Sequence, residues 1–401
     1  MLTARGRSAL LLGAALYVAA WAFGSNPLYP VAVGLVLAVC LAWVWVRLLD
    51  KPMELRRVSW GAEHVEGDDV SVVLELEHAG PVRPGSLTLV DDVAGLGRRE
   101  VILRRSGELL SGRYVVPRLP RGRYGFERTT AVIEDPFGLE SSEIDLSTGG
   151  ALLVYPRLAE LDRLFSEAGA HASEGRRMLL RRPSGFDIHS VREYEQGESL
   201  RNVHWRSTAR RGQLMVKELE DEPRDEVAVL LDAAAGVVAG EPPESSFDMQ
   251  VRAAGSILKA HARSGRRVAL VVNGAGRETV GVRDDEGDWR RALETLAAVQ
   301  PDGRTPVASL LSEGTAAGRA LELAVVTAQL PPELIERIAQ RASARRGISV
   351  VYVDAPTFAG RRPRALPELL RLEALGVPTV TLRRGDDLAA RLGGVAEAVG
   401  A

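Results

Sequence analysis

The amino-acid sequence predicts a multidomain fold: an N-terminal transmembrane helical hairpin, a β-sandwich in the middle and a C-terminal α/β domain. Two uncharged apolar runs open the chain, short alternating apolar segments follow, and continuous apolar strands then alternate with amphipathic helices. We place the hairpin in residues 1–50, the β-rich domain in 51–157, a linker with a highly charged segment in 158–225, and the α/β domain in 226–401.

The composition limits the classes of function. With 46% hydrophobic and 26% charged residues among 401, the chain has the composition of a globular protein. Its formal net charge of −2 lacks the positive surplus that nucleic-acid binding uses, so we expect no nucleic-acid partner. The single cysteine, Cys40, excludes an internal disulfide framework and a thiolate metal cluster.

The hairpin prediction rests on residues 8–24 and 31–46, which contain no charged side chain. As a helix, each run would span roughly 25 Å, near the lower limit for crossing a bilayer. A polar turn separates the runs, and basic residues flank only the outer ends: Arg5, Arg7, Arg47, Lys51, Arg56 and Arg57. This distribution predicts a multi-pass protein of the cell membrane with the bulk of the chain in the cytoplasm.

Two other interpretations of the apolar runs stay open. Arg5 and Arg7, followed by the small-x-small sequence Ala20-Trp21-Ala22, are also typical of a cleaved signal peptide. The second run would then be a lone anchor, and the topology of the rest would be inverted. The other interpretation is a hairpin buried inside a soluble domain, which the basic residues directly after the second run disfavour.

The middle of the chain carries the period-two pattern of β-strands. We expect strands at residues 70–77, 86–90, 100–103, 112–116, 129–133 and 151–155. Turn signals separate them, and Asp135-Pro136-Phe137-Gly138 is predicted to be a tight β-turn. Several short strands at this spacing favour a β-sandwich that acts as a spacer or interaction module. A helix-prone link, residues 158–168, follows.

From residue 226 onward strands and helices alternate, which predicts an open parallel sheet with helices on both faces. We expect strands at 227–231, 267–272, 321–327, 348–353 and 379–382, and helices at 247–263, 289–299, 331–345, 366–375 and 386–399. Ligands of such sheets bind at the carboxyl ends of the strands. The first strand ends at Asp232, but no glycine-rich fingerprint follows it, so the sequence disfavours nucleotide binding.

Residues 184–222, directly before the first strand of this domain, combine dense alternating charge with Tyr194 and Trp205. Two interpretations compete. In the first, the acids and bases pair with one another and lock the segment onto the edge of the sheet, with Trp205 burying one face. In the second, Trp205 and arginines such as Arg206 stay partly exposed as an interface anchor, because Trp and Arg are favoured interface hot spots.

This segment resembles the signature of the family of domain of unknown function 58, roughly R-x-Y-x-x-G-D-x-x-R-x-I-x-W-x-x-S-A-R followed by an L-x-V-K-E-like strand. The matching positions are Arg192, Tyr194, Gly197, Arg201, Trp205, Ala209, Arg210, Leu214, Val216, Lys217 and Glu218. Glu198, Val203 and Thr208 stand where the family has Asp, Ile and Ser. The upstream Asp-Pro-Phe-Gly-Leu and Val-Tyr-Pro motifs and the paired apolar start also look like this family. We call residues 184–222 the signature arm.

The resemblance implies a membrane-anchored protein whose C-terminal part is a von Willebrand factor A-like (Rossmann-like) α/β domain. It implies a MoxR-type AAA+ ATPase as partner and an adaptor role in complex assembly or envelope-related processes. Other membrane proteins would be further partners, and the lipid bilayer would hold the anchor. The resemblance establishes no enzymatic activity, and we expect none. The alternative is a structural envelope-assembly factor that acts without an ATPase.

The resemblance also bears on metal binding. A von Willebrand factor A domain usually carries D-x-S-x-S after its first strand, plus a distant Thr and Asp, and these oxygen ligands hold Mg²⁺. Here Asp232 is retained, but Ala234 and Gly236 stand where the hydroxyls belong. Thr305 is a candidate for the distant threonine, although Arg304 beside it would repel a cation. We therefore expect Asp232 and Thr305 to be vestigial positions, with no metal and no cofactor.

A hydrolase is the weaker alternative. His189 and His204 lie in the signature arm without another His or Cys at zinc-ligand spacing. The serines of this region lack a His-plus-acid arrangement that sequence alone can define: Ser184, Ser190, Ser199 and Ser207. We predict no catalytic residues.

Overall fold

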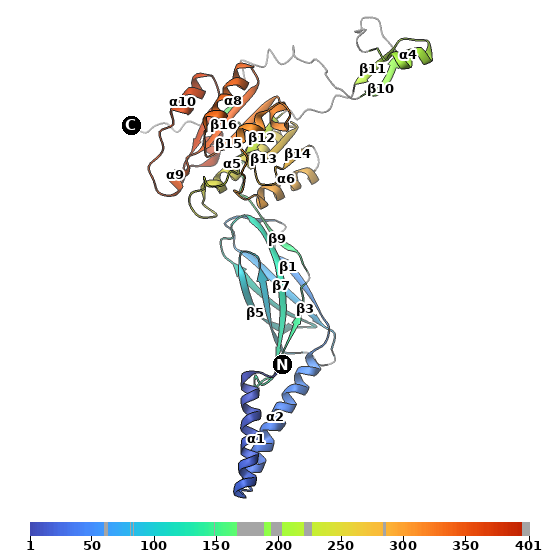
Figure 1. Ribbon diagram of the computed structural model, residues 1–401, viewed down its shortest axis with the longest axis vertical. Coiled ribbons are helices and arrows are strands. Elements are labelled where there is room, and N and C mark those ends of the chain that lie inside the picture. The colour runs from blue at the N-terminus through green and yellow to red at the C-terminus, as the bar shows by residue number, and fades with distance from the viewer. Residues whose placement is uncertain are drawn as a thin grey trace. The chain divides into compact units, whose positions relative to one another are not determined.

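The computed structural model describes residues 1–59, 63–80, 82, 84–147, 149–166, 188–193, 203–219, 227–283 and 286–394. The chain divides into two compact units, Met1–Tyr155 and Pro156–Ala401 (Figure 1). The first contains two apolar helices and a curled mixed sheet, and the second contains another sheet covered by helices. This organisation agrees with the predicted multidomain chain.

Helices α1 (Ala4–Phe23) and α2 (Leu28–Leu49) are both long and apolar enough to cross a membrane. Helix α1 begins where the Thr3 hydroxyl accepts a hydrogen bond from the Gly6 amide (3.0 Å). The buried residues of α1 are small and recur every seven positions: Gly6, Gly13 and Ala20. Gly13 faces α2, where an added Cβ would lie 3.2 Å from the Ala32 carbonyl oxygen, so the missing side chain allows the two backbones to approach closely. Gly6 lies instead against the Leu139 carbonyl oxygen.

In the described part of the first unit, nine strands form one curled sheet. They are β1 (Met53–Ser59), β2 (His64–Val65), β3 (Val70–His78), β4 (Ser86–Val93), β5 (Gly97–Ser106), β6 (Leu109–Val116), β7 (Gly122–Glu134), β8 (Ser141–Asp145) and β9 (Ala151–Tyr155). Their order is β1-β3-β6-β5-β4-β7-β9-β2, with β8 paired to β7. The sheet is mixed because β2 runs parallel to β9, whereas the other pairs are antiparallel.

One continuous sheet therefore replaces the two separate sheets of the predicted sandwich. Strand β7 is the reason, because its 13 residues pair with three strands, β4, β8 and β9. Its beginning, from Gly122 to Gly125, pairs with β9, and its later part, from Phe126 to Val132, pairs with β4. The sequence pattern reveals only residues 129–133 of this strand, since residues 123–128 are exposed or half-buried and carry no alternation.

The core of this sheet reaches the end of α2. Val46 and Leu49 of the helix pack with buried strand side chains such as Leu74 and Leu103. The Nε2 atom of buried His78 hydrogen-bonds to the Leu49 carbonyl oxygen (2.9 Å). Apolar packing and a hydrogen bond thus join the apolar hairpin directly to the β-domain.

A buried polar group, which we call the Asp91 cluster, consists of Asp91, Arg57, Thr129 and Tyr114. Asp91 is fully buried and forms an ion pair with Arg57 (3.0 Å). Its carboxylate also accepts hydrogen bonds from the hydroxyls of Thr129 (2.6 Å) and Tyr114 (3.0 Å). Burial, and then the neighbouring Asp91 charge, raise the pKa of Tyr114, so its hydroxyl stays a neutral donor.

The second unit contains a six-stranded sheet with the order β14-β13-β12-β15-β16-β17. The strands are β12 (Val227–Leu231), β13 (Val268–Val272), β14 (Thr279–Val282), β15 (Glu322–Thr327), β16 (Gly347–Val353) and β17 (Thr379–Leu382). All neighbours are parallel except β14, which is antiparallel to β13. The prediction of a wholly parallel sheet is wrong at this edge, because the short β14 has the sequence Thr-Val-Gly-Val, and glycine is depleted in strands.

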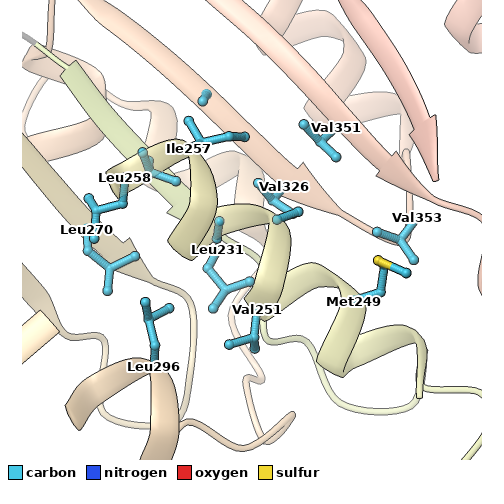
Figure 2. Close-up of a cluster of buried hydrophobic side chains, with 14 of the residues drawn as sticks. Leu231, Met249, Val251, Ile257, Leu258, Leu270, Leu296, Val326, Val351 and Val353 are labelled. Carbon is cyan, nitrogen blue, oxygen red and sulfur yellow. The ribbon is translucent and has the colours of Figure 1, made fainter. Parts of the chain in front are cut away.

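The helices of this sheet are α5 (Ser246–Arg263), α6 (Glu286–Ala298), α8 (Pro332–Ser343), α10 (Pro367–Ala374) and α11 (Leu388–Leu392), with short turns η3 (Val307–Leu311), α7 (Ala316–Arg319) and α9 (Ala355–Phe358). They cover both faces. Leu231 and Val326 pack with Ile257 of α5 on one face (Figure 2). Leu230 packs with Ile338 of α8 on the other. Adjacent residues of β12 therefore enter opposite cores, which explains why the strand is apolar throughout.

The helix predicted at 158–168 is wrong over its described part, residues 158–166, which runs as an irregular segment with one short turn. The Ala159 amide donates to the Ser256 hydroxyl of α5 (2.9 Å). Leu164 and Phe165 are buried in the same core as α5. Tertiary packing along α5 thus outweighs the local helix propensity, which is only a weak preference.

Candidate functional site

Asp232 lies at the carboxyl end of β12 and is 3% exposed. Its Oδ2 accepts a hydrogen bond from the Thr327 hydroxyl (2.7 Å), and its Oδ1 accepts one from Asn273 Nδ2 (3.1 Å). The side-chain nitrogen Nε2 of Gln329 lies 3.5 Å from Asp232 Oδ2. These donors are all neutral, so hydrogen bonds satisfy the buried carboxylate without a cation.

The parallel register of the sheet brings these side chains together. Leu231, the last residue of β12, is paired with Val272 of β13 and Val326 of β15. The next residues on the three strands are Asp232, Asn273 and Thr327, which therefore meet at one edge of the sheet. Strands β13 and β15 lie on opposite sides of β12 in the sheet. The carboxyl end of β12 is therefore the topological switch point, where open α/β sheets bind ligands.

Sequence analysis identifies Asp232 but misses Asn273 and Thr327. The available signal is that each is the first polar residue after a buried apolar run. The structure gives Thr305, the candidate distant threonine, other contacts. Its carbonyl accepts a hydrogen bond from Asn273 Nδ2 (3.0 Å), and its hydroxyl accepts one from Arg277 Nη2 (2.7 Å).

A cavity of about 680 Å³ opens at the switch point, and we call it the crevice. Small and apolar side chains form most of its lining, including Ala234 and Ala235 after β12 and Pro306 before η3. Its charged lining residues are Arg304 and Glu333, and both are exposed. A concave surface with few polar groups favours recognition by shape and a small number of hydrogen bonds.

The donor set of the crevice fits Mg²⁺ poorly. Magnesium prefers an octahedron of oxygen ligands, usually with one or two carboxylates. Ala234 and Gly236 contribute no hydroxyl, and both Asp232 oxygens already accept hydrogen bonds. Among the described residues, no group of three or more His, Cys, Asp or Glu side chains is arranged to hold a metal ion.

Gly303 fixes the wall of the crevice. Its amide donates to the Ala233 carbonyl (2.8 Å), and a Cβ on Gly303 would overlap the carbonyl oxygen of Asn273.

We expect Gly303→Ala to cost about 1–3 kcal/mol of stability, because backbone atoms must shift to admit the methyl group. Thermal unfolding of the full chain in detergent micelles measures this. Gly281→Ala on β14 is the matched control, since nothing lies within 4 Å of an added Cβ there. Equal melting temperatures for the two variants would contradict the expectation.

The described part of the signature arm has a small structure of its own. Strand β10 (Ile188–Glu193) pairs with β11 (Met215–Leu219) in an antiparallel two-stranded sheet. Helix α4 (Trp205–Arg211) packs beside them, where the Thr208 hydroxyl accepts a hydrogen bond from the Met215 amide (3.0 Å). Val203 and Met215 are buried. The described part of the arm therefore combines a two-stranded antiparallel sheet with a short helix.

The structure sorts the signature residues into three groups. Those on the paired strands are Arg192, Lys217 and Glu218. Those exposed on α4 are Trp205, Arg206, Ala209 and Arg210. Those outside the described residues are Tyr194, Gly197, Glu198 and Arg201. Positions one turn apart on a helix share a face, so the α4 group forms one surface, which we call the α4 face.

A single local contact bears on the hydrolase alternative. His204 Nδ1 and the Ser207 hydroxyl are 2.7 Å apart, but the residues are three positions apart at the start of α4. The hydrogen bonds of the described residues give His204 no carboxylate partner to orient its ring. Within the described ranges, this pair therefore has no third member of a catalytic triad.

The fold and site define a multidomain protein with two candidate membrane-spanning helices. The helices are followed by a curled mixed sheet and by an α/β sheet that carries the switch-point crevice. The family model "Protein of unknown function DUF58" matches residues 190–368, which include much of the signature arm and the crevice. Uncharacterized protein YeaD of Bacillus subtilis (strain 168) is 23% identical over 224 residues, which cover 55% of this chain. The matched region spans 54% of that relative's own length.

Similarities to solved structures are weak. Cwp6 from Clostridium difficile matches 84% of this chain and 55% of its own, at 10% identity and a TM-score of 0.18. A CARDB domain from Pyrococcus furiosus, crystallised in complex with di-metal ions, matches 24% of this chain and 86% of its own, at 13% identity and a TM-score of 0.17. The bacterial hydrophobin BslA matches 24% and 98%, at 12% identity and a TM-score of 0.15. Scores this low carry no argument about fold or function.

Proposed function

We propose that this protein is a membrane-anchored, non-enzymatic binding or adaptor protein that works with a MoxR-type AAA+ ATPase. Its C-terminal unit is a von Willebrand factor A-like domain with a degenerate metal site. The observation that carries the proposal is the α4 face, on which Trp205 is 67% exposed beside Arg206 and Arg210. Trp and Arg are the side chains that most often dominate the binding energy of protein interfaces.

The internal packing of the signature arm supports an interface role for Trp205. Val203, which precedes α4, and Met215, the first residue of β11, are both at most 3% exposed. Trp205, the first residue of α4, is exposed by contrast. An exposed tryptophan flanked by arginines is a typical anchor for a partner surface, which favours the second interpretation of the arm.

The contacts of the first residues support a retained hairpin over a cleaved signal peptide. The Thr3 amide donates to the Leu139 carbonyl (3.0 Å), and the Thr3 hydroxyl donates to the Gly138 carbonyl (2.7 Å). Cleavage near residue 22 would remove these contacts with the β-domain. With both apolar helices in the bilayer, Arg5 and Arg47 at their outer ends favour a cytoplasmic location for the bulk of the chain.

The crevice supports binding rather than catalysis. Asp232 is buried and held by neutral donors, so it is not placed as a free acid or base. The lining is mostly apolar, with Arg304 and Glu333 at exposed positions. These properties suit a partner's side chain or a short peptide segment, held without a bridging metal.

A crosslinked pull-down from intact membranes tests the adaptor role. We expect Trp205→Ala and Arg206→Ala each to reduce recovery of the ATPase about tenfold or more, because hot-spot truncations cost about 1.4 kcal/mol or more. The melting temperature should stay unchanged, since both side chains are exposed. Arg337→Ala, which removes an exposed arginine of α8, is the matched control and should leave recovery unchanged.

The outcomes separate the alternatives. If Arg206→Ala lowers the melting temperature, the arm is a packed structural element and the first interpretation of the charged segment holds. If wild-type chain recovers membrane proteins but no ATPase, the alternative of an ATPase-independent envelope-assembly factor is favoured. Unchanged recovery of the ATPase in both variants would contradict the α4 face as the binding surface.

A further inference from the structure

Phe137 is an exposed aromatic side chain on a tightly held turn. The turn follows β7, where the Gly138 amide donates to the Asp135 carbonyl (3.0 Å) and Gly138 has a φ of +66°. The buried Asp135 carboxylate accepts hydrogen bonds from the backbone amides of Phe137 (2.8 Å), Leu139 (2.6 Å) and Glu140 (2.7 Å). These bonds fix the backbone while the Phe137 side chain stays 74% exposed. An aromatic ring held in this way is available to an external apolar environment.

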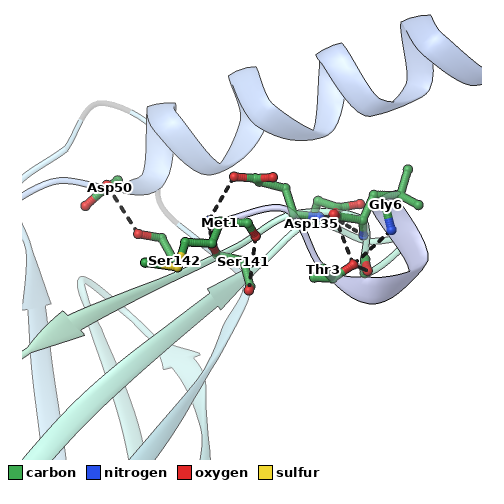
Figure 3. A network of polar contacts seen from close by, with 10 residues as sticks. Met1, Thr3, Gly6, Asp50, Asp135, Ser141 and Ser142 are labelled. Carbon is green, nitrogen blue, oxygen red and sulfur yellow. Dashed lines mark hydrogen bonds and ion pairs between the residues drawn. The ribbon is translucent and has the colours of Figure 1, made fainter. Parts of the chain in front are cut away.

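Hydrogen bonds join the turn to the residues at the start of helix α1 (Figure 3). The Thr3 hydroxyl donates to the Gly138 carbonyl (2.7 Å), while Leu2 forms a β-bridge with Glu140. Gly6, in the first turn of α1, lies so close that a Cβ there would overlap the Leu139 carbonyl oxygen. Residues 135–139, which we call the DPFGL turn, therefore lie against the first turn of the apolar hairpin.

The packing of the two helices fixes the level of this contact along the hairpin. A Cβ on Gly13 would lie 3.2 Å from the Ala32 carbonyl oxygen of α2. Because the helices are antiparallel and Gly13 lies against residues 32–36 of α2, Gly6, seven residues earlier on α1, lies level with residues 39–43 of α2. Gly6 itself is buried against the Leu139 backbone of the DPFGL turn. The DPFGL turn thus contacts the hairpin at the first turn of α1, level with the final turns of the apolar run in α2.

The same end of the hairpin carries the residues of a membrane interface. Trp43 and Trp45 are exposed near the end of α2, and the Arg47 guanidinium lies 5.5 Å from the Trp43 ring centroid. Arg5 is exposed on the first turn of α1. Trp and basic side chains gather where the hydrocarbon region of a bilayer meets the headgroups. Phe137 lies on a turn that contacts the hairpin at this level.

We propose that Phe137 inserts into the interfacial region of the lipid bilayer and makes the DPFGL turn a third membrane contact beside the two helices. This inference rests on the proposed membrane-spanning hairpin. Burial of the ring among lipid chains is favourable because it removes apolar surface from water. The contact would hold the β-domain in one orientation at the membrane surface, since the turn, β8 and α2 are also linked through the Ser142 hydroxyl and Asp50 (3.4 Å).

Depth-dependent fluorescence quenching of the full chain tests the proposal. Cys40→Ala removes the single cysteine, and one new cysteine is then introduced as Phe137→Cys, Ile102→Cys or Leu12→Cys. Each is labelled with a nitrobenzoxadiazole maleimide and reconstituted in vesicles of phosphatidylcholine and phosphatidylglycerol. Ile102, 61% exposed on β5, is the matched apolar control outside the turn, and Leu12, 54% exposed in the middle of α1, reports the hairpin.

We expect the probe at 137 to emit at shorter wavelength than the probe at 102 and to lose most of its emission when lipids carry a nitroxide near the headgroup. The probe at 12 should be quenched by a nitroxide deep in the acyl chain. A second measurement needs no attached fluorophore: a membrane-impermeant maleimide should react more slowly with Phe137→Cys than with Ile102→Cys in vesicles.

The experiment distinguishes failure of the proposed lipid contact at Phe137 from failure of the proposed membrane-spanning hairpin. Quenching at 12 together with equal behaviour of 137 and 102 would overturn the proposed lipid contact while leaving the hairpin intact, and would assign Phe137 to water or to a protein partner. No quenching at 12 would overturn the membrane-spanning hairpin itself.

Discussion

Asp91→Ala is expected to destabilise the β-domain by about 3–5 kcal/mol, the usual cost of leaving one member of a buried ion pair without its partner. The substitution would leave the Arg57 guanidinium, which is 10% exposed, without its carboxylate. The hydroxyls of Thr129 and Tyr114 would also lose their acceptor. Thermal and denaturant unfolding in detergent micelles should show this as an early transition of the first unit.

A neighbouring carboxylate provides the control for this prediction. Asp92 follows Asp91 on β4, but successive strand residues point to opposite faces, and Asp92 is only half-buried. Asp92→Ala should change stability by no more than about 0.5 kcal/mol. The double variant Asp91→Leu/Arg57→Met should recover much of the loss, because an apolar pair leaves no uncompensated charge. A cost below about 1 kcal/mol for Asp91→Ala would refute the view that the Asp91 cluster organises this core.

Acidification is expected to destabilise the second unit through His261. This side chain of α5 is 3% exposed, and burial, followed by the Arg266 charge, lowers its pKa from 6.5 to about 4. The unfolded chain therefore binds a proton between about pH 6.5 and 4 that the folded chain does not bind, so stability falls as the pH falls through this window. A shift of this size corresponds to roughly 3 kcal/mol, lost progressively between these two pH values.

The measurement is the free energy of unfolding at a series of pH values from 7.5 to 4.5, compared between wild-type chain and His261→Gln. Glutamine cannot gain a proton in this range, so the variant should lose less stability on acidification while retaining the contribution of every other group. Glu322, which pairs with Arg266 (2.5 Å), partly opposes the Arg266 effect on His261. Identical pH dependence in the two proteins would show that His261 does not titrate during unfolding.

Much of the fold in both units is predictable because its signals are local. Strands β12, β17 and β9 begin and end at the predicted residues, since each is a short apolar or alternating run between clear turn signals. The link at 158–166 is not predictable in this way. Its leucines have helical spacing, but Leu158 instead packs against Gly255, where a Cβ would lie 2.5 Å from a Leu158 methyl carbon. That competing contact is 97 residues away in sequence.

The sequence by itself determined the apolar hairpin, the position of Asp232 at the end of a buried strand and the position of the signature arm, because periodicity and flanking residues encode such features locally. Only the tertiary structure decided which groups surround them. Asn273 and Thr327 reach Asp232 from 41 and 95 residues away, and the register of three parallel strands brings them together. Thr3 reaches the DPFGL turn from 135 residues away, through the packing of α2 into the β-domain and the course of β7. Contacts of this kind depend on long-range strand pairing and chain closure, which no local pattern specifies.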